Sequence, residues 1–318
     1  MNFKKIIIPF AALTLATTIT ACSNNNTQTS TSEKAKEGEK VKVKTSQGEL
    51  EVAKNPKTVA VFDIAVLDLI QRYGVKVENL STPKISAKYV EGLIAGKDTA
   101  GNLREPNYEF LSTVKPDVIF VNQRQKDVLE ELKKVGPTAS FVANNKDYFN
   151  SMIEFNTEVA KIFGVEDKVK EDKAKFEAKI KEVSEKAKAS NKKVLIVMTN
   201  EGKITAFGPN SRFGYIHTLF GFKPVDENIE ESTHGNEINY EYISKMNPDI
   251  IFYVDRNTVV KSKTDANAKT TLDNELIKAT RAGKENAIYE IDAQYAYLAG
   301  NGLTAFEKIS EVLEKAVK

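Results

Sequence analysis

Residues 108–124 read YEFLSTVKPDVIFVNQR, and 132 positions later residues 240–256 read YEYISKMNPDIIFYVDR. When the alignment starts at Arg104 and Asn236, ten of its 21 paired positions are identical and no gap is needed. A constant offset over this length indicates an internal duplication, in which each copy contributes one lobe of the fold. Two lobes built from one unit predict a cleft between them.

Each copy ends in an arginine that follows an apolar run with the composition of a buried strand. The runs are VIFV at 118–121 and IIFYV at 250–254, and the arginines are Arg124 and Arg256. Because the duplication gives these arginines equivalent places in the two lobes, we expect both side chains to point into the cleft. Two cations that face one pocket predict an anionic ligand.

Strand-like apolar runs alternate with helical patterns along the chain. Strands are predicted at 194–198 and 203–207, which pair across the turn at 201–202, and helices are predicted at 213–220 and 305–317. Such alternation favours an α/β fold in which each lobe holds a mainly parallel sheet with helices on both faces.

Residues 147–190 separate the two copies and carry apolar side chains at helical spacing, interrupted only by Gly164. We interpret this segment as a rigid interlobe helix that spans both lobes. A surface helix within a single domain is the alternative. The interpretation divides the folded part into an N-terminal lobe at 41–146, the interlobe helix at 147–190 and a C-terminal lobe at 191–318.

Residues 1–21 have the pattern of a secretory signal, with Lys4 and Lys5 ahead of an apolar run that is too short to predict a membrane span. The run ends in ITAC, which resembles the bacterial lipobox and makes Cys22 the predicted site of lipid attachment. An ordinary signal peptide followed by a chance cysteine is the alternative. Residues 22–40 have almost no apolar side chains, so we expect a flexible tether.

The composition argues against several classes of function. Removal of the signal peptide takes away two lysines and leaves 44 basic and 44 acidic residues, a balance that gives no reason to expect nucleic acid as a partner. The single cysteine excludes an intramolecular disulfide and a cysteine-based metal cluster. Two histidines argue against a zinc or manganese site built from several histidines. The sequence shows no nucleophile with a base and no phosphate loop, so we do not expect an enzyme.

Four short motifs resemble those of one protein family. They are FGPNSRFG at 207–214, THGN at 233–236, VDR at 254–256 and AYL at 296–298. As a set they make the chain similar to the lipid-anchored substrate-binding proteins of ABC importers for ferric siderophores, and more narrowly to the catecholate-binding branch. The resemblance covers about residues 45–318. It implies a class III fold, with two pseudo-symmetric α/β lobes joined by one long helix and the ligand between them.

The resemblance also implies a ligand, a partner and a location. The ligand would be an iron(III)–catecholate siderophore or an iron–catechol complex, with no intrinsic cofactor. The partner would be the homodimeric or heterodimeric permease of an ABC importer. The protein would be a monomer, lipid-anchored at the extracellular face of a Gram-positive type of cell membrane. A haem-binding receptor lipoprotein of an ABC importer is the alternative, since haem can also use histidine, tyrosine and arginine.

Arg124, Arg212 and Arg256 match the arginine triad that the resemblance implies. The planar guanidinium group can donate to two adjacent oxygens and can stack on aromatic rings, so it suits an anionic catecholate complex. Charge-assisted hydrogen bonds of this kind contribute roughly 1.5–3 kcal/mol each. Arg104 is a fourth candidate, although its counterpart in the second copy is Asn236. A surface arginine that merely follows a strand is the alternative.

Some relatives use a histidine and a tyrosine as direct iron ligands when the siderophore leaves coordination positions open. His234 and Tyr297 match these positions, and both imidazole and phenolate are reasonable ligands for iron. Tyr295 is the alternative to Tyr297, because the segment reads as extended and places both tyrosines on one side. Ala296 stands where relatives often carry tryptophan. His217, by contrast, lies within a predicted helix and is expected to be structural.

Glu109 and Glu241 occupy the same position in the two copies. The resemblance implies that a glutamate on top of each lobe docks onto arginines of the permease. The alternative is an ordinary exposed glutamate in the first turn of a helix, which the helix dipole favours.

Overall fold

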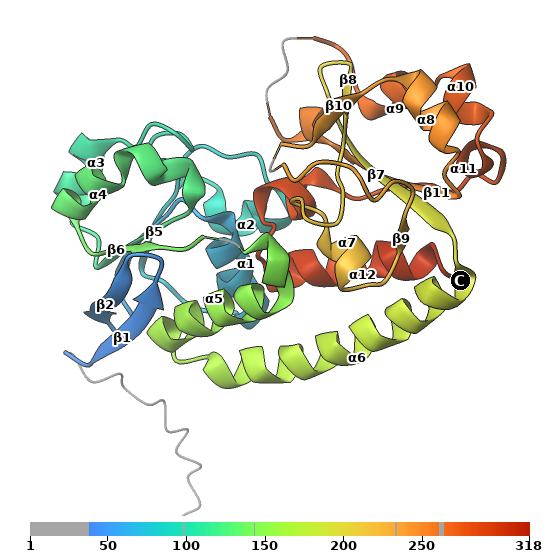
Figure 1. The fold of residues 1–318 in the computed structure, drawn as a ribbon. Helices are drawn as coiled ribbons and strands as arrows, with labels where there is room; N and C mark the ends of the chain where they lie inside the picture. The colour runs from blue at the N-terminus through green and yellow to red at the C-terminus, as the bar shows by residue number, and fades with distance from the viewer. Residues whose placement is uncertain (1–37, 98, 143, 233, 261–263) are drawn as a thin grey trace, which may run out of the picture. The chain divides into compact units, whose positions relative to one another are not determined.

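The computed structural model describes residues 38–97, 99–142, 144–232, 234–260 and 264–318. Lys36–Lys318 form one compact unit with two main sheets and the helices that cover them (Figure 1). The predicted signal peptide, the predicted lipidation site Cys22 and the predicted tether up to residue 37 lie outside the described residues. Within the described ranges, no helix is both long enough and apolar enough to cross a membrane.

The N-terminal sheet is parallel throughout, as predicted for each lobe. Its strand order is β4 (Asn79–Ser81), β3 (Thr58–Val61), β5 (Val118–Val121) and β6 (Thr138–Ser140). Helices α3 (Tyr108–Val114) and α4 (Leu129–Val135) pack on one face, and α1 (Ile64–Tyr73) and α5 (Tyr148–Phe163) pack on the other. The antiparallel hairpin of β1 (Lys40–Thr45) and β2 (Gly48–Ala53) precedes this sheet.

The C-terminal sheet is mixed, because a hairpin extends its parallel part. Strands β7 (Lys193–Asn200), β11 (Ile250–Asp255) and β12 (Ile288–Glu290) run parallel, with β9 (Lys223–Pro224) beside β7. Strand β8 (Lys203–Ala206) returns antiparallel to β7 and pairs with β10 (Asn236–Ile238). The predicted pairing across the turn at 201–202 is therefore confirmed.

The remaining helices are short, apart from α6 (Glu166–Ser190) and α12 (Leu303–Lys315). They are α2 (Glu91–Ile94), α7 (Tyr215–Thr218), α8 (Tyr240–Met246), α9 (Ala268–Leu272), α10 (Glu275–Lys278) and α11 (Arg281–Lys284). The helix predicted at 213–220 is found only as α7, so the prediction was too long by about half. The segment before it is a tight turn, as described below.

The internal duplication is visible in the local structure of both copies. Helices α3 and α8 begin and end at equivalent positions. Asn107 caps α3 by accepting a hydrogen bond from the backbone N–H of the third residue after it, and Asn239 does the same for α8. Each helix ends at a residue in the left-handed conformation, Lys115 with φ of 48° and Asn247 with φ of 46°. The identical positions therefore include the asparagine that begins each helix, whereas the residue that ends it is lysine in one copy and asparagine in the other.

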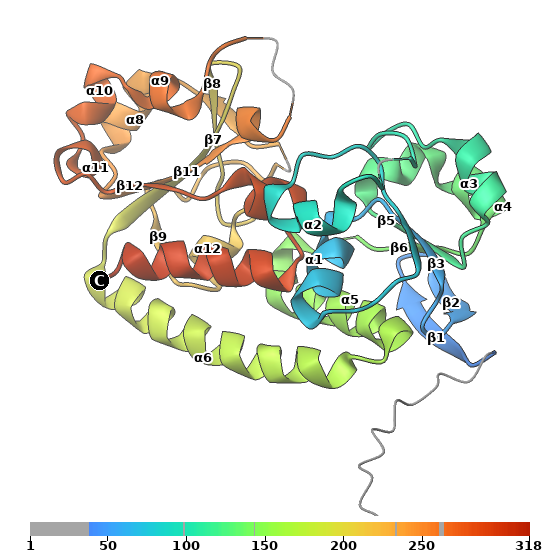
Figure 2. The ribbon, with the colours of Figure 1, turned by 180° about the vertical axis from the view of Figure 1, so that it is seen from behind.

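The predicted interlobe segment contains the long helix that was expected, together with a second helix. Helix α6 (Glu166–Ser190) has 25 residues, which corresponds to a length of about 38 Å. Helix α5 precedes it and ends at Gly164, whose φ of 63° is easily adopted by glycine and terminates the helix. Helix α6 lies alongside both α5 and the C-terminal helix α12 (Leu303–Lys315) (Figures 1 and 2).

The two lobes share one hydrophobic core. A single cluster of buried side chains includes residues of β3 and β5 from the N-terminal sheet, of β7 and β11 from the C-terminal sheet, and of α1, α5, α6 and α12. The α6 side chains Phe176 and Val183 belong to this cluster, as does Phe306 of α12. The helices between the sheets therefore hold the lobes together by continuous apolar packing.

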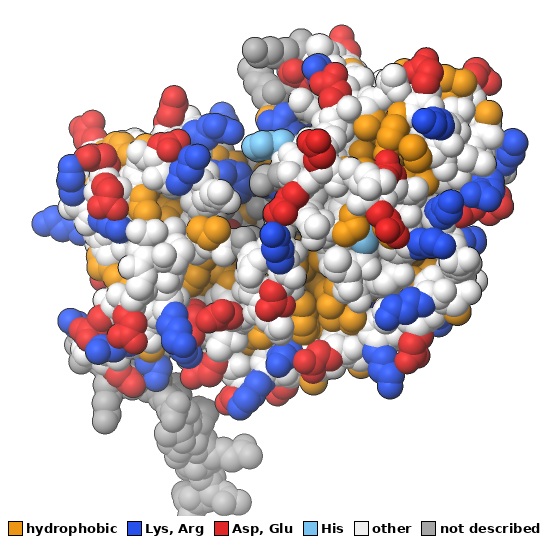
Figure 3. All heavy atoms as spheres, viewed as in Figure 1, with side chains coloured by type: hydrophobic (Ala, Val, Ile, Leu, Met, Phe, Trp, Pro, Cys, Tyr) orange, Lys and Arg blue, Asp and Glu red, His pale blue; other side chains and the backbone are white. Residues whose placement is uncertain are grey.

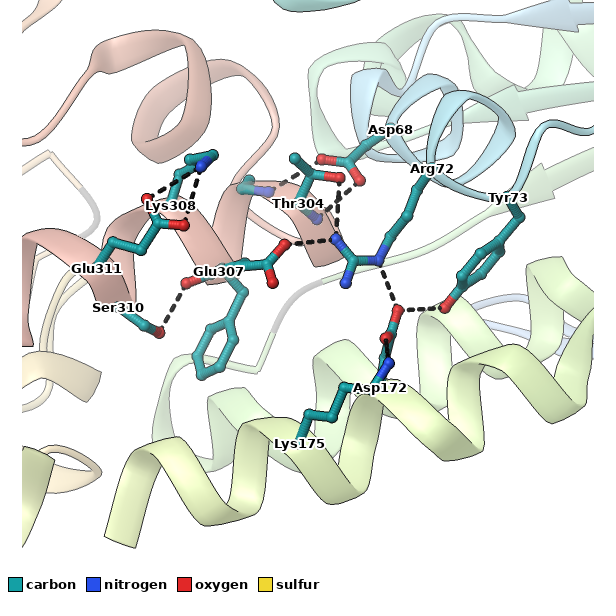
Figure 4. Close-up of polar contacts among 12 residues, drawn as sticks. Asp68, Arg72, Tyr73, Asp172, Lys175, Thr304, Glu307, Lys308, Ser310 and Glu311 are labelled. Atoms are coloured by element: carbon teal, nitrogen blue, oxygen red, sulfur yellow. Dashed lines mark hydrogen bonds and ion pairs between the residues drawn. The ribbon is translucent and has the colours of Figure 1, made fainter. Parts of the chain in front are cut away.

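Polar contacts tie three of these helices, α1, α6 and α12, together, as Figure 4 shows. Arg72 of α1 donates to Asp172 of α6 at 2.5 Å and to Glu307 of α12 at 2.8 Å. Asp68 of α1 accepts from the backbone N–H groups of Thr304 and Ala305 at 2.9 and 3.0 Å. A carboxylate from the N-terminal lobe thus satisfies free N–H groups at the start of α12.

Candidate functional site

A cavity of about 140 Å³ lies between segments of the two lobes. Arg124 and Asn122 come from the N-terminal lobe, while Arg212 and Tyr297 come from the C-terminal lobe. The other lining residues are Asp63, Gln123, Phe141, Asn145, Tyr148, Phe213, Tyr215, Ala296, Leu298, Gly300 and Asn301. The cavity thus combines cationic, amide and aromatic side chains.

Arg124 is positioned by the turn that follows β5. The side chain of Asn122 accepts from the backbone N–H of Arg124 at 2.9 Å and opens the short 3-10 helix Gln123–Val128. The Arg124 guanidinium group then reaches across to the other lobe, where Nη2 donates to the carbonyl oxygen of Tyr297 at 2.8 Å. Arg124 thus lines the cavity between the lobes, and its role in binding a ligand stays a prediction.

Arg256 follows β11 in the same way in the second copy. Asp255 is buried, and its carboxylate accepts from the backbone N–H groups of Asn257 and Ala268 at 3.1 and 2.7 Å. The hydrogen bonds of the Asp255 carboxylate therefore fix the backbone next to Arg256. Arg256 Nε donates to the Tyr297 hydroxyl at 3.0 Å, and Nη1 donates to the Asn200 side chain at 2.6 Å.

Arg212 sits in a turn that depends on glycine. A Cβ on Gly214 would lie 2.0 Å from the carbonyl oxygen of Pro209, a separation that no side chain can accept. The Ser211 hydroxyl closes the turn by donating to the carbonyl oxygen of Gly208 at 2.6 Å. The turn sequence that was singled out for its resemblance thus has a physical role, which is to present Arg212 to the cavity.

The ring of Tyr297 lies among all three guanidinium groups. The guanidinium carbon lies 4.9 Å from the ring centroid for Arg212, 5.3 Å for Arg256 and 5.7 Å for Arg124. These separations are within the range of cation–π attraction. The three arginines predicted for the cleft are therefore brought together around one aromatic ring.

The same arrangement perturbs two ionisable groups. Burial opposes ionisation of Tyr297, but the hydrogen bond from Arg256 and the three guanidinium charges outweigh it, so the pKa of Tyr297 is lowered from its ordinary value near 10. Burial lowers the pKa of Arg212. The charge of Arg124 lowers this pKa further, whereas Tyr297 raises it. The guanidinium group still remains charged at physiological pH.

Not every residue predicted from the sequence lies at the cavity. Arg104 is exposed in the loop before α3 and is not among the lining residues. His234 is also exposed and outside the lining, with its backbone N–H bonded to the Ser232 hydroxyl. His217 is buried beside the carbonyl oxygen of Phe222, and burial lowers its pKa to about 4, in agreement with a structural role.

The prediction of an extended segment was wrong, because Gln294–Leu298 form a π-helical turn. Side chains two positions apart on a helix do not share a face, so Tyr295 and Tyr297 point in different directions. Tyr297 lines the cavity, while Tyr295 packs on Tyr89 with ring centroids 4.9 Å apart. Tyr297 is therefore the tyrosine available to a ligand in the cavity.

Glu109 and Glu241 lie on the surface in the first turns of α3 and α8. These helices belong to different lobes, as Figure 1 shows. Elsewhere, Figure 3 shows basic and acidic side chains interspersed over the visible face of the molecule, in agreement with the balanced composition. At the cavity, Arg124 and Arg212 belong to the lining, and Arg256 adds a third positive charge beside the Tyr297 ring.

Sequence reasoning missed the aromatic and amide side chains of the cavity. Tyr148, Tyr215, Asn145 and Asn301 all contribute to its lining. Tyr215 directly follows the glycine-rich turn that carries Arg212, which was the one available signal. Among the described residues, no group of three or more histidine, cysteine or acidic side chains is arranged to hold a metal ion.

Comparisons with known proteins show the family to which this chain belongs. The sequence profile of the family described as periplasmic binding protein matches residues 67–295. The chain is 36% identical to the petrobactin-binding protein YclQ of Bacillus subtilis over 98% of this chain and 100% of the relative. The crystal structure of YclQ matches with a TM-score of 0.82 and 34% identity, covering 88% of this chain and 99% of that chain.

Two further solved structures are similar over nearly their whole length. The iron uptake ABC transporter substrate-binding protein PiuA of Streptococcus pneumoniae matches with a TM-score of 0.81 and 32% identity, covering 87% of this chain and 98% of that chain. The periplasmic catecholate-siderophore binding protein VctP of Vibrio cholerae matches with a TM-score of 0.78 and 30% identity, covering 87% of this chain and all of that chain.

Proposed function

This chain belongs to the periplasmic binding protein family, and we propose that it captures an iron(III)–catecholate siderophore between its lobes for delivery to an ABC permease. The names of its relatives support a ferric siderophore as the ligand, and that of VctP supports the catecholate class. The chain acts by binding and transfer and is not an enzyme. No intrinsic cofactor is required.

One observation carries this proposal, namely the three guanidinium groups around the Tyr297 ring at 4.9–5.7 Å. A ferric catecholate presents negative oxygens at the edges of aromatic rings. Guanidinium groups can donate to those oxygens and stack on those rings, and Tyr297 already occupies such an environment. Because Arg124 comes from one lobe and the other two arginines from the second, an anionic ligand would be bound by both lobes at once.

The small volume of the cavity means that it must open to admit a siderophore. Ligand sites usually enclose about 300–1,000 Å³, whereas this cavity is about 140 Å³. A ferric siderophore therefore displaces the Tyr297 ring from between the arginines or separates the lobes. The lowered pKa of Tyr297 favours the phenolate, a hard oxygen donor for iron(III), so Tyr297 can ligate iron in complexes that leave coordination positions open. His234 joins as a second ligand only if its loop turns inward.

The remaining parts of the chain complete the transport assignment. Residues 1–21 direct export, Cys22 carries the lipid anchor at the outer face of the cell membrane, and the segment between Cys22 and β1 is the tether. A lipid-modified cysteine with two or more acyl chains gives stable anchoring. The lobes at 41–146 and 191–318 present Glu109 and Glu241 to the two subunits of the permease. The binding protein acts as a monomer.

Haem is not favoured as the ligand. The relatives described above are named for siderophore binding or iron uptake rather than for haem.

A titration of the purified protein with two ligands tests the proposal. An iron(III)–catecholate complex is expected to quench the tyrosine fluorescence at micromolar concentrations or below, whereas haem is expected to produce no shifted Soret band. The opposite pattern would contradict it, with a saturable Soret shift and no response to ferric catecholate.

A further inference from the structure

Asn200 is the last residue of strand β7, and its side chain contacts Arg256. The Asn200 Oδ1 atom accepts a hydrogen bond from Arg256 Nη1 at 2.6 Å. The same guanidinium group uses Nε to donate to the Tyr297 hydroxyl at 3.0 Å. Asn200 and Arg256 are both half-buried. Because the two bonds leave from different nitrogens of one planar group, together they fix the direction in which that group points.

The backbone on either side of this contact is held by hydrogen bonds between the ends of β7 and β11. The two strands are parallel neighbours, and Asp255 lies opposite Thr199 in their register. The Thr199 hydroxyl donates to the Asp255 carboxylate at 3.2 Å. In the turn beyond the strands, the backbone N–H of Glu201 donates to the Asn257 side chain at 3.0 Å. The asparagine and the arginine therefore lie side by side between two fixed contacts.

In the first copy of the duplication, an alanine stands where the second copy has Asn200. Strand β3 ends at Val61 and is followed by α1, whereas β7 runs on to Asn200. When residues are counted from the equivalent strand pairings of the two copies, the place of Asn200 falls on Ala65 inside α1. The Arg124 guanidinium group donates instead to the Tyr297 carbonyl oxygen of the other lobe. The two duplicated arginines are thus held in different ways.

We propose that Asn200 is a positioning residue, which orients the Arg256 guanidinium group toward the Tyr297 ring before a ligand arrives. This inference rests on the proposed function and deepens it, because it makes the two duplicated arginines unequal in role. Arg256 is oriented within its own lobe, whereas Arg124 depends on contact with the opposite lobe. A side chain that is already ordered in the free protein loses less entropy when it binds a ligand.

An amide is a suitable partner for an arginine that has to bind an anion. The amide oxygen of Asn200 accepts a hydrogen bond without adding a negative charge, so Arg256 keeps its full positive charge for the ligand. A carboxylate at the same place would also hold the arginine, but it would offset that charge and repel an anionic guest. Burial raises the pKa of Tyr297, and the hydrogen bond and charge of Arg256 are the strongest influences that lower it, as an ordered and charged Arg256 requires.

Ultraviolet titration of the ligand-free protein tests the positioning without any ligand. Asn200→Ala frees the Arg256 side chain and weakens its hydrogen bond to Tyr297, so the pKa of Tyr297 should rise. Asn200→Asp keeps the shape of the side chain but adds a negative charge, so it should raise this pKa as well. Asn79→Ala, which changes an exposed asparagine at the start of β4, is the control and should leave the titration unchanged. An unchanged titration in both Asn200 variants would overturn the inference.

A double-mutant cycle tests whether Asn200 acts on binding through Arg256. Dissociation constants for iron(III) complexed with 2,3-dihydroxybenzoate are measured by fluorescence quenching for wild type, Asn200→Ala, Arg256→Gln and the double variant. Asn200→Ala alone should weaken binding about 3- to 10-fold. In the Arg256→Gln background the same change should weaken it by less than about twofold, because the arginine that it orients is gone. The same loss in both backgrounds would show that Asn200 acts independently and would overturn the inference.

The two measurements separate failure of this inference from failure of the proposed function. If wild-type protein did not bind the ferric catecholate, the proposed function would be contradicted, and the titration of ligand-free protein would still decide whether Asn200 orients Arg256. Unfolding temperatures verify that each variant is folded. Asn200→Asp, which is nearly identical in shape to the natural residue, carries the titration should Asn200→Ala be unstable.

Discussion

At Tyr297, a single phenol group experiences the fields of three cations. The Tyr297 hydroxyl accepts a hydrogen bond from Arg256, and the Tyr297 backbone carbonyl oxygen accepts one from Arg124 of the other lobe. The residue therefore does two things in this structure. It lies between guanidinium groups that would otherwise repel one another, and it links the lobes at the cavity.

The pKa of Tyr297 gives a direct prediction. Ultraviolet titration of phenolate formation should show a component that ionises below the ordinary tyrosine range, and that component should be missing in Tyr297→Phe. Arg256→Gln removes a hydrogen bond and a positive charge that favour the phenolate, so the pKa of Tyr297 should rise. Arg281→Gln, an exposed arginine that pairs with Asp249, is the control and should leave the titration unchanged. A low-pH component that survives in Tyr297→Phe would contradict this assignment.

Arg124 and Arg256 were predictable because the duplication assigns them without any knowledge of tertiary contacts. Arg212 was identified by its motif, and the close approach of Gly214 to Pro209 gives that motif a steric reason. Tyr148 and Tyr215 could not be found in this way. Their ring contact joins residues 67 positions apart, and no local pattern distinguishes a buried tyrosine of the core from one that faces a cavity.

Among the elements, helices α1, α6 and α12 carry the coupling between the lobes. Arg72 lies at their junction with Asp172 and Glu307, and its side chain is only 15% exposed (Figure 4). Asp68 caps α12 from α1, and a Cβ on Gly302 would lie 2.4 Å from its carboxylate. These contacts fix α12, whose preceding loop leads into the cavity through Gly300 and Asn301.

Arg72→Ala should therefore destabilise the protein by about 3 kcal/mol, because it leaves the largely buried Asp172 without its guanidinium partner. Denaturant unfolding monitored by circular dichroism measures this change. Lys175→Ala removes the exposed partner of the same carboxylate and should cost less than about 1 kcal/mol. If Arg72→Ala lost no more unfolding free energy than Lys175→Ala, the junction at Arg72 would not be important for stability.

Prediction of the elements succeeded where the signals are local. The hairpin of β7 and β8 was predicted from the turn at 201–202 that joins the two strands. The helix expected at 213–220 is shorter because the tight turn at 208–214 uses the residues before it. The π-helical turn at Gln294–Leu298 could not be predicted, since it depends on where the chain must deliver Tyr297 between two lobes.

For the whole molecule, the duplication places one exposed glutamate on a helix of each lobe. If Glu109 and Glu241 dock onto the permease, charge reversal in Glu109→Lys/Glu241→Lys should abolish iron–siderophore uptake by cells. The affinity of the purified protein for the ferric catecholate should remain within about twofold of wild type, because neither residue lines the cavity. Glu130→Lys/Glu275→Lys changes two other exposed helix glutamates and is the matched control. Normal uptake by the docking variant would contradict the assignment.

The central claim is that arginines from both lobes bind one anionic guest, and a double-mutant titration tests it most directly. Dissociation constants for an iron(III)–catecholate complex are measured for wild type, Arg124→Gln, Arg256→Gln and the double variant. Each single change should weaken binding about 10-fold or more, which corresponds to the loss of one charge-assisted contact. The double variant should bind at least 100-fold more weakly than wild type at low ionic strength. Wild-type affinity in the double variant would contradict the account.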